Sequence, residues 1–107
     1  MPDNLNNMQQ INNAIKALET IRDEAPLVDT PSVDGAIAKL EGKKELLATD
    51  HWDDFKSNIT DADFAKLHSA QQAFADATQS EEARTEKLSQ GVAISKKIIE
   101  TLKKLPI

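Results

Sequence analysis

Apolar residues recur at intervals of three and four along nearly the whole chain, a spacing that keeps one face of an α-helix apolar. No segment alternates apolar and polar residues in the manner of a half-buried strand. Alanine, the best helix former, occurs fourteen times, whereas the β-branched valine occurs three times. The sequence therefore predicts an all-α fold, a small antiparallel helical bundle of four to five helices.

The first helix is predicted from Asp3 to Glu24, with Asp3 as its N-cap. Pro26 lies beyond its end, because the residue before a proline is pushed out of the helical conformation. The apolar face of this helix contains Leu5, Met8, Ile11, Ile15, Leu18 and Ile21.

A second helix is predicted after the connection 26–31, with Thr30 as its cap and Pro31 at its first position, where a missing N–H costs nothing. It should end near Ala48 or Thr49. Its buried face contains Val33, Ile37, Leu40 and Leu47.

Residues 50–58 are predicted to form a short helical turn capped by Thr49 or Asp50, with Trp52 and Phe55 filling the core beneath it. Thr60 and Asp63 have the spacing of a capping box that opens the next helix.

The apolar positions from residue 61 to residue 104 share one seven-residue register, so the last two helices either merge into one or break in the middle. An unbroken helix over these residues would be about 66 Å long, too long for a compact domain of this size. Polar residues occupy the middle of the register, and Ser80 followed by two glutamates is a good helix start. These features favour a break near Ser80.

The length of 107 residues fits a single helical domain, residues 1–107, and the absence of cysteine excludes disulfides, thiolate nucleophiles and thiolate metal sites. The first ten residues contain neither the basic residue nor the apolar run of a signal peptide, and no stretch is apolar enough to span a membrane. We therefore expect a cytoplasmic protein with no membrane partner.

The net charge of −5 argues against nucleic-acid binding, which needs clustered cations. The charge is unevenly distributed, because residues 1–79 carry −7 and residues 80–107 carry +2. The lysines of the last turns complement the negative end of a helix dipole, and the alternative is a basic docking patch. These lysines are Lys96, Lys97, Lys103 and Lys104.

All three glycines fall inside predicted helices, where each costs about 1 kcal/mol relative to alanine. Gly91 lies within the apolar stripe of its helix, which predicts close approach of another helix of the bundle. Gly35, Ala38 and Gly42 lie opposite the apolar face of the second helix. They are either tolerated surface residues or a smooth strip onto which a partner or a second copy docks.

The polar face of the first helix is uncharged where surface helices usually carry Lys and Glu. It is either a solvated, frayed surface or a second docking surface, since amides can form neutral hydrogen bonds across an interface. Its residues are Asn6, Asn7, Gln9, Gln10, Asn12 and Asn13, of which Asn6, Gln9, Gln10 and Asn13 are our candidate binding residues.

Titratable chemistry is concentrated between Asp50 and Asp54, with one further imidazole at His68. His51, Asp54 and His68 could contribute to a metal-assisted hydrolase, but no metal-binding spacing is present and the histidines fall on different predicted helices. There is also no phosphate-binding glycine loop and no nucleophile motif. We therefore expect no cofactor, no metal and no catalytic residue, and keep the hydrolase as the alternative.

At mid-chain, Trp52-Asp53-Asp54 resembles the Trp-x-Gly turn of the WXG family, small secreted helical-hairpin proteins of similar length that are acidic and free of cysteine. The glycine of that motif is absent here. Pro26 and Pro31 also interrupt the half that is one continuous helix in the family. The resemblance implies a secreted helical hairpin, which is a further alternative.

The function that these observations favour is a non-catalytic protein-interaction module, such as an inhibitor, immunity, adaptor or assembly protein. Its partner would be another protein or a second copy of the chain, as in a homodimer. Docking would use the glycine strip or the amide face.

Overall fold

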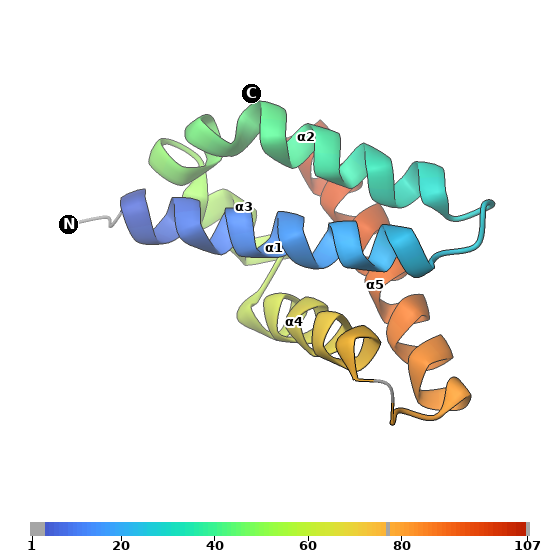
Figure 1. Cartoon of the computed structure of the whole chain (residues 1–107). Helices are drawn as coiled ribbons and strands as arrows, with labels where there is room; N and C mark the ends of the chain where they lie inside the picture. Colours follow the sequence, from blue (N-terminus) through green and yellow to red (C-terminus); the bar gives the residue numbers. More distant parts are fainter. Residues whose placement is uncertain (1–3, 77, 107) are drawn as a thin grey trace.

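The chain forms five helices and no strand within residues 4–76 and 78–106, which are the residues that the computed structural model describes (Figure 1). The predicted all-α bundle is confirmed. The helices are α1 (Asn4–Glu24), α2 (Thr30–Thr49), α3 (Trp52–Asn58), α4 (Asp61–Ala75) and α5 (Glu81–Lys104).

The bundle is built around α1, which packs against α2 on one side and α4 on the other (Figure 1). α2 runs antiparallel to α1, whereas α4 runs in the same sense as α1. α5 crosses behind them and contacts α1, α2 and α4. The short α3 links the α1–α2 pair to the α4–α5 pair, and the longest dimension of the molecule is 42 Å.

The break between the last two helices is confirmed at Ser80, the N-cap of α5. Its hydroxyl accepts a hydrogen bond from the backbone N–H of Ala83 at 3.1 Å, which satisfies one of the unpaired donors at the helix start. On the preceding side, the carboxylate of Asp76 accepts hydrogen bonds from the backbone N–H and the hydroxyl of Thr78. These local bonds stabilise a turn where a merged helix would need a straight backbone.

Two predicted helix caps are wrong by one or two residues. The N-cap of α2 is Asp29, and the hydroxyl of Thr30 donates to the carbonyl of Pro26 at 3.1 Å because the chain has already begun to turn there. The N-cap of α3 is His51, because the backbone N–H groups of both Asp50 and His51 donate to the carbonyl of Leu46 and so still belong to the end of α2. The predicted cap Asp3 lies outside the described residues.

The core contains the predicted apolar faces with one exception. Leu5, in the first turn of α1, is 81% exposed. The largest fully buried apolar side chains are Ile11, Leu18, Ile21, Val33, Leu40, Leu47, Phe55, Ile59, Leu67 and Ile98.

Gly91 lies where α5 crosses α1, and it is buried. A Cβ atom added to it would lie 2.7 Å from Cδ1 of Ile21 and 3.1 Å from Cγ2 of the same residue. The predicted packing role of this glycine is confirmed.

Asn7 was assigned from the sequence to the polar face of α1, but it is buried. Its side-chain amide donates a hydrogen bond of 3.1 Å to the carbonyl of Ala48 in the last turn of α2. Carbonyls in the last turn of a helix lack partners within the helix, so Asn7 caps α2 from a position 41 residues away.

None of the described helices is long and apolar enough to cross a membrane.

Candidate functional site

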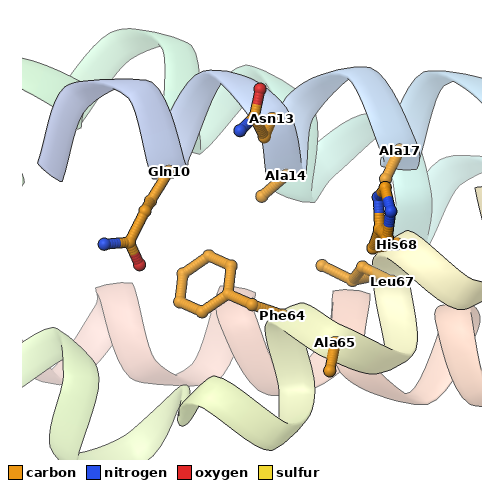
Figure 2. A pocket seen from close by; sticks show the side chains of 8 residues that line it. All are labelled: Gln10, Asn13, Ala14, Ala17, Phe64, Ala65, Leu67 and His68. Atoms are coloured by element: carbon orange, nitrogen blue, oxygen red, sulfur yellow. The ribbon is translucent and has the colours of Figure 1, made fainter. Parts of the chain in front are cut away.

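A groove of about 290 Å³ lies between α1 and α4. Figure 2 shows Gln10 and Ala14 reaching from α1 toward α4, and Phe64 and His68 reaching from α4 toward α1. The full lining is Gln10, Asn13, Ala14, Ala17, Phe64, Ala65, Leu67 and His68. Two of these residues, Gln10 and Asn13, are candidates from the sequence, and the groove joins them to a helix more than 50 positions away.

The groove is hollow because alanines occupy the positions where the two helices face each other. Ala14 and Ala17 are buried on α1, and Ala65 on α4 is exposed at the groove. A methyl group at these positions leaves space that a leucine would fill, while buried Leu67 forms an apolar floor.

Phe64 is held in place by an aromatic cluster that extends to α3. Its ring centroid lies 6.5 Å from that of Trp52 and 6.2 Å from that of Phe55, distances typical of favourable aromatic pairs. The ammonium of Lys56 lies 4.8 Å from the Phe64 centroid and also pairs with the carboxylate of Asp61. The prediction that Trp52 and Phe55 pack beneath the connection is confirmed, and the same cluster fixes one wall of the groove.

The rim of the groove is polar but carries no permanent charge. Gln10 and Asn13 each offer an amide that both donates and accepts hydrogen bonds, and His68 offers an imidazole. No Asp, Glu, Lys or Arg contributes to the lining. This arrangement can hold an apolar side chain and form neutral hydrogen bonds to the backbone that carries it.

Asn6, Asn7 and Gln9, which also belong to the uncharged face predicted on α1, do not line the groove. Asn6 and Gln9 are exposed on other parts of α1, and Asn7 is buried in its bond to Ala48. The uncharged face predicted from the sequence is therefore divided, and only its α4-facing part belongs to a concave surface.

The glycine strip of α2 is also divided. Gly42 faces open space and Ala38 is exposed, as predicted. The prediction that Gly35 points away from the bundle is wrong, because a Cβ atom there would lie 3.2 Å from Cδ1 of Ile99 on α5. Gly35 therefore packs against Ile99 of α5, and the exposed part of the strip consists of Ala38 and Gly42.

His51, Asp54 and His68 do not form a common site. Nδ1 of His51 is 3.9 Å from the nearer carboxylate oxygen of Asp54, beyond hydrogen-bond distance, whereas His68 lies at the α1–α4 groove. Among the described residues, no three His, Asp or Glu side chains gather closely enough to hold a metal ion. The donor set needed by the hydrolase alternative is therefore not assembled in this part of the chain.

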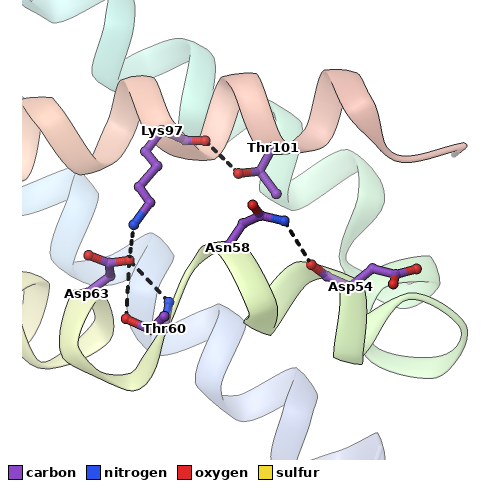
Figure 3. Close-up of polar contacts among 6 residues, drawn as sticks. All are labelled: Asp54, Asn58, Thr60, Asp63, Lys97 and Thr101. Carbon is purple, nitrogen blue, oxygen red and sulfur yellow. Dashed lines mark hydrogen bonds and ion pairs between the residues drawn. The ribbon is translucent and has the colours of Figure 1, made fainter.

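One buried charged group lies outside the groove, at the start of α4 (Figure 3). The carboxylate of Asp63 accepts hydrogen bonds from the backbone N–H of Thr60 at 3.1 Å and from the ammonium of Lys97 on α5 at 2.8 Å. The predicted capping box is confirmed, and Lys97 ties it to α5. Burial raises the pKa of Asp63, but the bonds from Lys97 and Thr60 and the positive charge of Lys66 outweigh burial, so its pKa lies below the ordinary value of 3.8.

No family model, curated protein or solved structure matches this chain. The helical hairpin implied by the WXG resemblance is not formed either, because the connection after Glu24 and the short α3 divide the described chain into five helices.

Sequence reasoning missed Phe64, Ala65 and Leu67 as groove residues. The available signal was the pair Ala14 and Ala17, which are small residues beside an apolar stripe made of isoleucine, leucine and methionine.

Proposed function

We propose that the protein is a non-catalytic protein-interaction module that binds a short apolar segment of a partner protein in the α1–α4 groove. The observation that carries this proposal is the combination of an apolar floor with a neutral amide rim. Inhibitor, immunity, adaptor and assembly proteins are classes that act through such surfaces.

The size of the groove favours a side chain over a whole small-molecule substrate. Its volume of about 290 Å³ is at the lower limit of ligand pockets, which typically measure about 300–1,000 Å³. One or two large apolar side chains would fill it, in contact with Leu67 and the ring of Phe64.

The rim favours an uncharged partner segment. A charged side chain in the groove would lose water without meeting an opposite charge, since the lining holds none. The amides of Gln10 and Asn13 can instead pair with the N–H and C=O groups of a peptide backbone.

The proposal is tested by selecting peptides that bind the chain from a displayed random library and measuring their affinity for two tryptophan variants. Ala65→Trp fills the groove from an exposed position, so the fold should persist. Ala38→Trp is the matched control, because it places the same side chain on the exposed face of α2.

We expect the selected peptides to contain one or two large apolar residues. Their affinity for Ala65→Trp should be at least about tenfold lower than for the parent chain, and their affinity for Ala38→Trp should be unchanged. Affinity that is lost with Ala38→Trp and kept with Ala65→Trp would contradict the proposal, because it would indicate that the peptides bind to α2. A library that yields no binding peptide would refute the proposal.

A further inference from the structure

The α1–α4 groove contains one titratable side chain, the imidazole of His68. Figure 2 shows this ring reaching from α4 toward α1. The other lining residues do not change charge with pH, because they are two amides, three alanines, a leucine and a phenylalanine. This inference rests on the proposed function, since it concerns the regulation of the same groove.

The surroundings of His68 favour its neutral form once the groove is filled. His68 is an exposed residue of the free chain, so water can hydrate an imidazolium there. An apolar side chain of a partner would displace this water, and no Asp or Glu in the lining replaces it. A charge that loses water without gaining an opposite charge is costly. Protonation of His68 therefore opposes binding of an apolar segment.

The charged residues of the helices around His68 lie outside the lining. Of the carboxylates, Glu24, Asp61 and Asp63 are each already in an ion pair. Lys66 lines a separate hollow between α4 and α5. The full set is Lys16, Glu19 and Glu24 of α1, Asp61, Asp63 and Lys66 of α4, and Arg84 and Lys97 of α5.

The range from about pH 5 to pH 8 isolates the histidines, because imidazole is the side chain that ordinarily changes charge there. The chain has two histidines, and the other one, His51, is the N-cap of α3 and does not line the groove. The pKa of Asp63 lies below 3.8, so this carboxylate stays ionised throughout the range. A change of binding in this range can therefore be assigned to one of two residues.

We propose that His68 makes the α1–α4 groove a pH-sensitive site, which binds its apolar segment at neutral pH and releases it when the imidazole is protonated. The neutral ring can both accept and donate a hydrogen bond at the rim, whereas the imidazolium only donates. Binding selects the neutral form, so acidification weakens binding and binding in turn displaces a proton from the ring.

The experiment measures the affinity of library-selected peptides at pH 7.5 and pH 5.5. The peptides used contain no Asp, Glu or His, so that their own charge stays constant. Affinity for the parent chain should fall about tenfold at pH 5.5, because the binding-competent neutral form is then a minor fraction. At about pH 6, calorimetry should also detect proton release on binding, as a heat that depends on the ionisation enthalpy of the buffer.

Two variants assign the effect. His68→Gln keeps a neutral hydrogen-bonding side chain that does not titrate, so its affinity should be equal at the two pH values. His51→Gln is the matched control and should keep the parental pH dependence. Circular dichroism at both pH values should show parental helix content for both variants.

The two proposals on this groove fail in different ways. Parent affinity that is equal at the two pH values or higher at pH 5.5, a fall that persists in His68→Gln, or binding without proton release would overturn the role of His68 alone. A chain for which the library yields no binding peptide at either pH would overturn the proposed function and the role of His68 with it.

Discussion

A Cβ atom added to Gly91 would lie 2.7 Å from Cδ1 of Ile21, so α5 and α1 cross at a point where only the hydrogen of a glycine fits. Ile21 is fully buried, and three of its carbon atoms lie within 3.2 Å of the added atom, so rotation of its tip alone would not make room. The crossing sets how closely α5 packs on the helix that carries one wall of the groove.

Gly91→Ala should therefore lower the free energy of unfolding by about 1–3 kcal/mol, the usual cost of overpacking a core. This loss should appear although alanine is the better helix former by about 1 kcal/mol. Urea unfolding followed by circular dichroism measures it. A variant more stable than the parent would show that the helices can separate at little cost.

Gly42→Ala should have the opposite effect. Apart from the adjoining backbone of α2 and the two neighbouring residues, no atom of the described residues lies within 4 Å of an added Cβ, and the position is exposed, so the gain in helix propensity is unopposed. We expect the free energy of unfolding to rise by about 0.5–1 kcal/mol in the same urea assay. A loss of stability would indicate that the backbone at residue 42 needs glycine.

Asn7→Ala should lower the free energy of unfolding by about 1–2 kcal/mol, because it leaves the carbonyl of Ala48 without its donor. Gln9→Ala is the matched control on the exposed side of α1 and should change stability by less than about 0.5 kcal/mol. Thermal unfolding of both variants checks this. Equal losses of stability would mean that the hydrogen bond from Asn7 to Ala48 does not stabilise the fold.

Asp63 gives stability a defined pH dependence. Its pKa is lower in the folded chain than the ordinary 3.8, so the ionised form is stabilised by folding, and its contribution is present above pH 3.8 and lost as the pH falls through the folded pKa. Asp63→Asn should cost about 1 kcal/mol at pH 7, and the difference from the parent should shrink below pH 3.8.

Asp50→Asn is the control for this measurement, because Asp50 is exposed at the C-terminal end of α2. It should cause no loss of stability at pH 7. Urea unfolding at pH 7 and pH 3 measures both variants. If the difference in stability between Asp63→Asn and the parent is the same at the two pH values, the ion pair with Lys97 does not contribute to stability.

Local features of the fold could be predicted because neighbouring residues determine them. The cap at Ser80, the Thr60–Asp63 box and the apolar faces of α2 and α5 each depend on residues within one helix or turn. The packing of Gly91 was also predictable, since its place in an apolar stripe already implies contact with another helix.

The features that the sequence left open depend on which helices become neighbours. The periodicity of α2 could not show that Ile99 of α5 covers Gly35. Asn7 and Asn6 look alike in the sequence, yet Asn7 is buried in its hydrogen bond to the end of α2 and Asn6 is exposed. The groove needs α1 beside α4, a pairing that single-helix patterns do not specify.

The most direct test of the central claim is a titration of the ¹⁵N-labelled chain with a selected peptide, followed by two-dimensional NMR. Binding in the groove predicts that the largest amide shift changes fall within residues 10–17 and 64–68, including the side-chain amides of Gln10 and Asn13. Changes centred on residues 38–46 of α2 or on residues 82–103 of α5, with residues 10–17 and 64–68 unchanged, would contradict it.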